Sequence, residues 1–362
     1  MAISLPNVQQ APSDVAPPEQ AWLQLVQARV EAALGLLFEL PDEASLDPRW
    51  SRAMEQARDY ALRPAKRLRP ALVLAGHGLA RESTAVPPGL WGFAAGLELL
   101  HTFLLIHDDV ADQAALRRGG PVLHRMLAPG RQGEDLAIVV GDHLFARSLE
   151  AMLESELPGV TRVVQYYLGV CRHTAAGQYL DLDLSRMPLS EVTLFQTLRV
   201  AHLKTARYGF SAPLVCGAML GGADETLKKG LEQVGRSVGL AYQLRDDLIG
   251  LFGDASVAGK ACDGDFTQGK RTFPLMAAYV RATPAGREEL ERLWALPVEQ
   301  KDAEALARAR ALVESFGGRV ACERAVERAS RSARRGLQAL PNSHGMRDLL
   351  DALIARLARR AS

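Results

Sequence analysis

Cysteine is scarce in this chain, and neither sign of charge is in excess. The four cysteines are widely spaced and form no CxxC pair: Cys171, Cys216, Cys262 and Cys322. This pattern argues against a disulfide framework or a zinc site and is typical of reduced thiols, so we expect a cytoplasmic protein. With 43 basic and 42 acidic side chains the net charge is +1, which provides no global field for nucleic acid. No apolar stretch reaches about 18 uncharged residues, so we expect no membrane span.

Long alternating runs of β-branched residues are few, and no Gly/Ser-rich linker divides the middle of the chain. Apolar periodicity continues through residues 135–154, 160–184 and 231–251, as a bundle of long helices requires. We therefore predict an all-α fold with a single domain over residues 19–362. Residues 1–18 are rich in Pro, Ala and Gln and lack a basic segment followed by an apolar block, so we expect a flexible extension and not a signal peptide.

A cluster of aspartates directly follows an apolar run. Residues 97–107 contain neither Gly nor Pro and predict a buried helix that leads into Asp108, Asp109 and Asp112. Asp108 and Asp112 share one face of that helix, and such neighbouring carboxylates repel each other. Mg²⁺ prefers oxygen ligands and is usually held by one or two carboxylates plus substrate phosphates. The sequence therefore predicts a magnesium-diphosphate site, the alternative being that the acids end the helix in a solvated loop.

A second pair of acids, Asp246 and Asp247, lies within another apolar stretch. Gln243 shares a helix face with Asp247. Gly250 stands where a third carboxylate would complete the DDxxD spacing, so this cluster offers two strong ligands. Two acid clusters could together bind one polyanion through metal ions.

Basic residues flank both acid clusters in a fixed order. They are Lys66, Arg67 and Arg69 before the first cluster, Arg117 and Arg118 just after it, Lys204 between the clusters, and Lys260 and Lys270 after the second. Arginine binds phosphate oxygens with two parallel hydrogen bonds, whereas lysine acts as a mobile point charge, so the mixture suits two separately bound diphosphates. Each pair taken alone is also compatible with a solvated basic surface.

Seven ordered motifs resemble the trans-isoprenyl diphosphate synthases, the polyprenyl synthetase family, over roughly residues 60–280. The motifs are KRLRP from Lys66, ELLHTFLLIHDDVAD ending at Asp112, RRGGPVLH from Arg117, GQYLDL ending at Leu182, KTARYGF from Lys204, YQLRDD ending at Asp247, and GKRT from Gly269. The resemblance implies a bundle of long antiparallel helices around a central cavity, of the isoprenoid synthase type. It also implies a homodimer that condenses isopentenyl diphosphate head-to-tail with an allylic diphosphate by means of Mg²⁺, as three ions with substrate bound.

The resemblance further implies roles for individual residues. Mg²⁺ would bridge the allylic diphosphate to Asp108, Asp112 and Asp246, supported by Asp109 and Asp247. Residues that would contact the allylic diphosphate are Arg117, Lys204, Thr205, Gln243, Lys260 and Lys270. Residues that would hold isopentenyl diphosphate are Lys66, Arg69, His101 and Arg118. We assign no side chain as the base that removes the final proton.

Two further residues lie three apart on one predicted helix face, Gln178 and Asp181. Their place in the GQYLDL motif favours a position lining the metal cavity, in support of the metal-binding acids. The alternative is an ordinary capping pair.

Product length depends on what lies below the first acid cluster, because a growing chain must run along the helix away from Asp108. Phe103 lies five residues before Asp108, with Leu104 beside it. One bulky ring at these positions resembles family members that stop near twenty carbons, so we expect geranylgeranyl diphosphate. Farnesyl diphosphate and longer chains are the alternatives.

Two other classes of protein deserve comparison. A class I terpene cyclase also ionises an allylic diphosphate at a DDxxD helix but needs no residues for a second substrate. A non-catalytic partner subunit typically loses acids of the clusters, whereas this chain keeps five carboxylates and shows only Gly250 as a departure. Both observations favour the condensing enzyme.

Overall fold

The computed structural model describes residues 18–40, 45–81, 85–253 and 264–358. Helices account for nearly all of the regular structure in these ranges, so the all-α prediction is confirmed. A small hairpin of β1 (Leu116–Arg117) and β2 (Gly120–Pro121) interrupts them. Lys260 and Cys262 lie outside the described residues, as does the predicted extension except for Pro18, where the first helix begins.

The helices differ widely in length. The long ones are α1 (Pro18–Leu36), α5 (Pro88–Ala111), α7 (Gly130–Leu153), α8 (Val160–Leu184), α11 (Glu225–Phe252) and α17 (Gly318–Gln338). The shorter α-helices are α3 (Pro48–Leu62), α4 (Leu68–Ala80), α6 (Leu123–Leu127), α9 (Leu194–Val200), α10 (Ala212–Leu220), α13 (Gly264–Thr267), α14 (Phe273–Arg281), α15 (Pro284–Trp294), α16 (Ala303–Ser315) and α18 (Met346–Ala358). Single turns of 3₁₀-helix are η1 (Leu189–Glu191), η3 (Val298–Gln300) and η4 (Ser343–Gly345), and η2 (Ala201–Ser211) is a π-helix.

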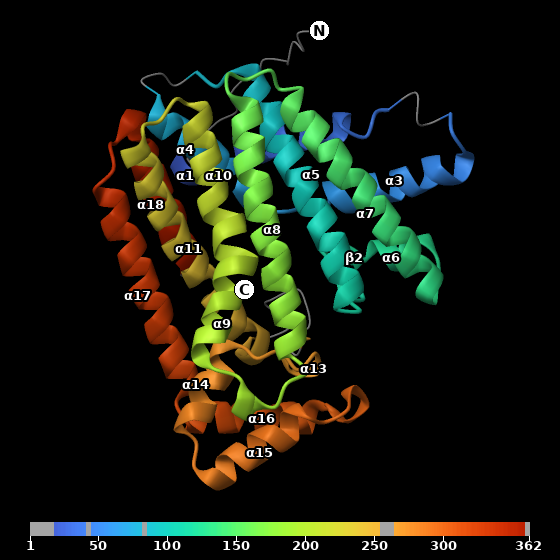
Figure 1. The fold of residues 1–362 in the computed structure, drawn as a ribbon, viewed down its shortest axis with the longest axis vertical. Coiled ribbons are helices and arrows are strands. Elements are labelled where there is room, and N and C mark those ends of the chain that lie inside the picture. The colour runs from blue at the N-terminus through green and yellow to red at the C-terminus, as the bar shows by residue number, and fades with distance from the viewer. Residues whose placement is uncertain (1–17, 41–44, 82–84, 254–263, 359–362) are drawn as a thin grey trace.

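The long helices run roughly side by side, with α14, α15 and α16 gathered at one end of the bundle (Figure 1). Helix α5 packs on α7, α4 on α10, and α11 on both α17 and η2. Glycines allow the close contact of α4 with α10, because a Cβ on Gly76 or Gly217 would collide with a carbonyl group of the facing helix. The main core lies between these helices and buries apolar side chains from both halves of the chain.

Helix α5 is the most apolar long element and runs through the core. It starts at Pro88, which suits a first turn that needs no N–H donor, and ends where the backbone N–H of Asp112 donates to the carbonyl of Asp108 at 2.8 Å. Among the described residues it is the one helix whose length and composition would allow a membrane span, and 67% of the relevant window is buried within the fold. Such burial is typical of a core helix. Helix α5 therefore carries the first acid cluster at the end of an element that is packed into the core.

Candidate active site

The acids of the first cluster lie at the C-terminal end of α5, where lysines from other elements approach them. Oδ1 of Asp108 accepts a hydrogen bond from Nε2 of Gln178 at 2.9 Å and lies 3.3 Å from Nζ of Lys204. Oδ2 of Asp112 accepts from Nζ of Lys270 at 2.9 Å. The structure therefore brings together residues of α5, α8, η2 and the segment before α14, as the predicted site requires.

Asp109 has different partners from its two neighbours. It is 1% exposed, and its carboxylate accepts hydrogen bonds from the Tyr60 hydroxyl at 2.6 Å and from Nε of Arg117 at 2.8 Å. Arg117 also lies 3.7 Å from Oδ2 of Asp108. Tyr60 was not among the predicted site residues, because it lies on α3, far in the chain from either acid cluster. Asp109 therefore fixes α3 and the β-hairpin to the end of α5, and its buried carboxylate is already satisfied by these donors.

Lys204 lies on η2, an 11-residue π-helix between α9 and α10. Its Nζ donates to Oδ2 of Asp181 at 2.7 Å, so Asp181 and Gln178 both face the first acid cluster from α8. A Cβ on Gly177 would collide with the backbone of η2, so this glycine lets α8 approach Lys204 closely. π-helical turns are rare and frequently occur at functional sites.

Burial and charge act in opposite directions on these groups. Burial alone would raise the pKa of Asp108, but the ammonium groups of Lys204 and Lys270 hold it below its usual value. For Asp112 burial prevails and raises the pKa in spite of Lys270. Burial lowers the pKa of Lys204, yet Asp108 and Asp181 outweigh it, so the pKa is raised and the side chain stays charged.

The second cluster is organised by a chain of hydrogen bonds from η2 to α11. The Thr205 hydroxyl donates to Oε1 of Gln243 at 2.6 Å, and Nε2 of Gln243 donates to Oδ1 of Asp247 at 2.8 Å. The backbone N–H of Phe273 donates to the other oxygen of Asp247 at 3.3 Å. Burial, followed by the nearby charge of Asp265, raises the pKa of Asp247 to about 7. Asp246, the preceding residue, is half-buried.

A second group of cations lies near the N-terminal part of α4. The guanidinium of Arg69 lies over the ring of Tyr208, 4.9 Å from its centroid, and the ring of His101 lies 6.1 Å from the same ring. Arg118, in the β-hairpin, lies 3.6 Å from Oε1 of Glu98. Buried nitrogens without a hydrogen-bond partner among the described residues include Nε of Arg69, Nη1 of Arg118 and Nδ1 of His101. Unsatisfied donors around cationic groups form a site that an anion would complete.

Arg67 belongs to the same basic motif but has a structural role. It is 2% exposed, adopts a left-handed backbone with φ of 45°, and donates from Nη1 to Oε1 of Glu98 at 2.9 Å. The carbonyl groups of Ala61 and Arg63 accept from its Nη2. Glu98 is a single acid inside an apolar run of the sequence. Because buried charges are paired, its position indicated that a basic residue lies against it. Lys66, by contrast, has an exposed side chain.

Phe103 lies within an aromatic group on the side of α5 that faces α7. Its ring centroid is 5.1 Å from that of Phe145 and 4.6 Å from that of His107. A Cβ on Gly141 would collide with the His107 ring, so this glycine makes room for the group. Leu104, the next residue, packs on the main core.

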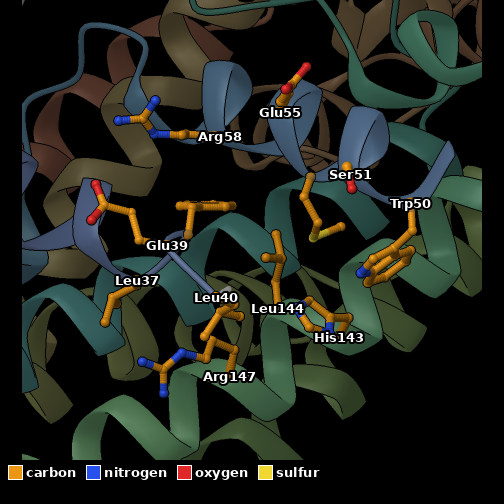
Figure 2. A pocket seen from close by; sticks show the side chains of 12 residues that line it. Leu37, Glu39, Leu40, Trp50, Ser51, Glu55, Arg58, His143, Leu144 and Arg147 are labelled. Carbon is orange, nitrogen blue, oxygen red and sulfur yellow. The ribbon is translucent and has the colours of Figure 1, made fainter. Parts of the chain in front are cut away.

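A separate pocket of about 260 Å³ lies between the end of α1, α3 and α7, lined by side chains that include Leu37, Trp50, His143 and Leu144 (Figure 2). None of its lining residues belongs to the two acid clusters or to the basic motifs.

The arrangement of the acids fits a divalent cation that arrives with phosphate. No group of three or more His, Cys, Asp or Glu side chains converges as a preformed metal cage in the described part of the chain. Asp108 and Asp112 instead each have a lysine ammonium group beside them, which marks positions where positive charge is favourable. Mg²⁺ bound by one or two carboxylates plus substrate phosphates would suit such positions.

Comparison with known proteins agrees with this geometry. The model of the polyprenyl synthetase family matches residues 51–313. The short chain isoprenyl diphosphate synthase of Methanothermobacter thermautotrophicus is 34% identical over 246 residues, 67% of this chain and 71% of that protein. The geranylgeranyl diphosphate synthase of Mycobacterium tuberculosis is 35% identical over 270 residues, 74% of this chain and 73% of that protein.

Solved structures show the same architecture. Geranylgeranyl pyrophosphate synthase from Corynebacterium glutamicum, complexed with isoprenyl diphosphate and magnesium, superposes with a TM-score of 0.84 at 26% identity, over 94% of this chain and 98% of that one. Names of other relatives include farnesyl, geranylfarnesyl and octaprenyl diphosphate synthases, so the relatives differ in chain length. With the family model matched over more than half of its length, the chain belongs to the polyprenyl synthetase family and is a prenyltransferase.

Proposed function

We propose that this prenyltransferase condenses isopentenyl diphosphate head-to-tail (1'-4) with an allylic diphosphate to give a trans-polyprenyl diphosphate. The presence of two distinct groups of cations carries this proposal. Lys204 and Lys270 lie against the acids of α5. Arg69 and Arg118, with the uncharged His101 beside them, form the second group, and each retains a buried nitrogen without a hydrogen-bond partner in the described part of the chain. Two groups of this kind suit two diphosphates bound at the same time.

The acids and lysines of the first group would ionise the allylic substrate. Bound Mg²⁺, as three ions held by Asp108, Asp112 and Asp246, would neutralise the diphosphate and make it a better leaving group. Lys204 and Lys270 would then turn from carboxylates to phosphate oxygens and stabilise the charge that develops as the bond breaks. Lys260, Arg117, Thr205 and Gln243 complete the proposed set of allylic contacts, with Gln178 and Asp181 orienting the acids.

The second group would hold isopentenyl diphosphate in register with the allylic carbon. Arg69 and Arg118 would donate to its phosphate oxygens, with Lys66 reaching from the exposed side. His101 can donate from Nδ1 while remaining uncharged, since burial and the neighbouring arginines hold its pKa well below its usual value. Fixing both substrates removes much of the entropic barrier of a bimolecular step.

We propose geranylgeranyl diphosphate as the main product. Phe103, five residues before Asp108 on α5, would lie about 7.5 Å along the helix from the acid. Its contacts with the rings of Phe145 and His107 restrain the Phe103 ring, which supports a firm stop for the growing chain. A farnesyl or longer-chain synthase is the alternative, and the names of relatives include both.

The second cation group also distinguishes this proposal from its rivals. A class I terpene cyclase folds one allylic diphosphate onto itself and has no use for a second anion site. A non-catalytic subunit has no reason to keep the lysines beside Asp108 and Asp112. We also propose a cytoplasmic location, which the unpaired thiols of Cys171, Cys216 and Cys322 support.

A homodimer is the assembly that we propose. Helix α7 exposes apolar side chains to solvent, notably Val139 at 58%, Leu153 at 44% and Leu136 at 43%. A row of such side chains on one long helix is suited to packing against a second copy of the chain. Light scattering of the wild type and of Val139→Glu would test it, with a shift toward monomer expected for the variant.

The two-site proposal is tested by replacing one arginine of the second group. Arg69→Gln should raise the KM for isopentenyl diphosphate at least tenfold and leave the binding of a non-reactive allylic thiodiphosphate unchanged. Arg49→Gln, which alters an arginine on the surface of α3, is the matched control. Equal loss of both substrates, or no loss of either, would contradict separate sites for the two diphosphates.

A further inference from the structure

The second acid cluster lacks one carboxylate in its sequence. Gly250 comes four residues after Asp246, so the two positions are neighbours on one face of α11. A side chain at residue 250 would therefore stand next to Asp246. In this fold the carboxylate of Asp265, from α13, fills that place.

The Asp265 carboxylate lies directly against the Cα of Gly250, where a side chain would begin. A Cβ built on Gly250 would collide with Oδ2 of Asp265 and lie 2.7 Å from its carboxyl carbon and 3.4 Å from Oδ1. An aspartate at residue 250 would place its own carboxyl carbon about 1.5 Å from that Cβ. The two carboxylates would thus compete for nearly the same space, so an acid at residue 250 would push the Asp265 carboxylate out of its present position.

Neighbouring contacts hold Asp265 in this position. Phe266, the next residue, is fully buried and packs edge-on against Trp294 with ring centroids 5.0 Å apart. Nζ of Lys301 donates to the carbonyl of Phe266 at 2.9 Å, and the backbone N–H of Lys270 donates to the carbonyl of Asp265 at 2.8 Å. The turn that carries Asp265 is therefore anchored to the core formed by α14, α15 and α16.

The surroundings of Asp265 are those of the acid site. Its charge is the main electrostatic influence that raises the pKa of Asp247, after burial itself. Burial lowers the pKa of Lys270, but the charges of Asp112 and Asp265 outweigh burial and raise it. Nζ of Lys270 also contacts Asp112 directly. The segment is further tied to the first cluster because Nε2 of Gln268 donates to the carbonyl of Asp112 at 3.1 Å. The charge of Asp265 thus acts both on Asp247 of the second cluster and on Lys270, the partner of Asp112 in the first cluster.

We propose that Asp265 supplies the carboxylate that Gly250 omits, and that Asp246 and Asp265 together hold the divalent cation on the α11 side of the diphosphate. The inference rests on the proposed function and adds a metal-binding residue to it. Gly250 is then required, because any side chain at that position would displace the Asp265 carboxylate. The competing explanation is that Gly250 only makes room for the packing of α13.

The test measures binding of Mn²⁺ to purified full-length protein in the presence of inorganic diphosphate, with free Mn²⁺ followed by electron paramagnetic resonance. We expect Asp265→Asn to weaken the affected Mn²⁺ site by about 10–100-fold. The double variant Gly250→Asp/Asp265→Gly moves the carboxylate from α13 to α11 and should restore most of that affinity. Asp183→Asn, an exposed acid of α8, is the control and should bind as the wild type.

A second measurement separates a metal role from a packing role. Without metal, Asp265→Asn should leave the melting temperature close to that of the wild type, because relief of the repulsion with Asp247 offsets the lost attraction to Lys270, whereas loss of a packing contact would lower it. Wild-type affinity in folded Asp265→Asn, or no recovery in the folded double variant, would overturn the inference. The condensation activity of the wild type is measured separately. If the wild type condenses its substrates but the Mn²⁺ results contradict the inference, the proposed function stands and only the role of Asp265 is wrong.

Discussion

Nζ of Lys270 lies 2.9 Å from Oδ2 of Asp112, although 158 residues separate the two in the chain. Lys204 makes a similar approach to Asp108 from a different element. Each of these two acids of α5 is therefore neutralised by a lysine when no metal is present. In the proposed reaction, metal ions at the carboxylates would free the same lysines to bind phosphate oxygens, so one set of ion pairs would replace the other.

Removal of Lys270 should leave Asp112 without its partner. We expect Lys270→Met to lower the free energy of unfolding in the presence of EDTA by about 2 kcal/mol, since hydrogen bonds to charged groups contribute about 1.5–3 kcal/mol. Urea denaturation measures this change. Lys228→Met, which removes an ion pair with the exposed Glu225, should change stability by less than about 1 kcal/mol. Equal effects of the two variants would contradict a special role for the Lys270 pair.

Arg67 should be the most important arginine for folding. Arg67→Met removes the nearer cationic partner of the buried Glu98 carboxylate and leaves only Arg118 at 3.6 Å, so it should cost about 3 kcal/mol. The double variant Arg67→Met/Glu98→Gln should recover part of that loss, because the buried carboxylate charge is removed together with its nearer partner. Thermal unfolding of both, with Arg49→Met as a surface control, checks the prediction. A double variant less stable than Arg67→Met would contradict it.

His101 should make the protein sensitive to acid. Charged or polar groups that face the ring are Arg67, Arg69, Arg117, Arg118 and the Tyr208 ring. Burial and these cations hold the folded-state pKa of His101 well below 6.5, whereas the unfolded chain gains a proton near pH 6.5. The unfolded state therefore binds more protons below pH 6.5, and stability is lost as the pH falls.

The measurement is chemical denaturation of the wild type and of His101→Gln at pH 5, 6 and 7. Between pH 6 and 5 the wild type should lose about 1.2 kcal/mol more than the variant, slightly less than one proton per pH unit because the unfolded-state histidine is not fully protonated at pH 6. His77, His124 and His202 also have lowered pKa values, but they are present in both proteins and cancel. Identical slopes would contradict the prediction, because they would show that His101 takes up its proton over the same pH range in the folded and unfolded states.

Product length should respond to Phe145 as well as to Phe103. Phe103→Ala removes the proposed stop, and Phe145→Ala removes the ring that keeps Phe103 in place, so both variants should make chains at least one isoprene unit longer. Chromatography of the dephosphorylated products measures this. Phe195→Ala, at an exposed position on α9, should leave the length unchanged. Unchanged products from Phe103→Ala would remove the basis for the C20 assignment.

Features that depend on a motif were predictable from the sequence, and features that depend on contacts between distant segments were not. The apolar run before Asp108 predicts α5, and the spacing of Gln178 and Asp181 predicts that both face one side of α8, where they bind Asp108 and Lys204. Helical periodicity predicts the shared face of the two residues, whereas their position at the acid cluster was predicted only from the resemblance of the GQYLDL motif. The all-α fold follows from the same regularity.

No sequence motif predicts the partners of Asp109 or the contact of the Asp265 carboxylate with Gly250. Tyr60 is 49 residues from Asp109 in the chain, and nothing in its helix distinguishes it from a core tyrosine. The position of Asp265 beside α11 depends on tertiary contacts of its neighbours, such as the packing of Phe266 against Trp294. In both cases tertiary packing selects the contact, so a motif with a missing acid gives no indication of which residue replaces it.

The most direct test of the account is the reaction itself. Purified protein with Mg²⁺ and labelled isopentenyl diphosphate is incubated with allylic starters of five, ten and fifteen carbons in turn. We expect label to enter an allylic product whose dephosphorylated alcohol has twenty carbons, and we expect no product when EDTA removes the metal. Label that enters no product from any starter would contradict the proposed condensation.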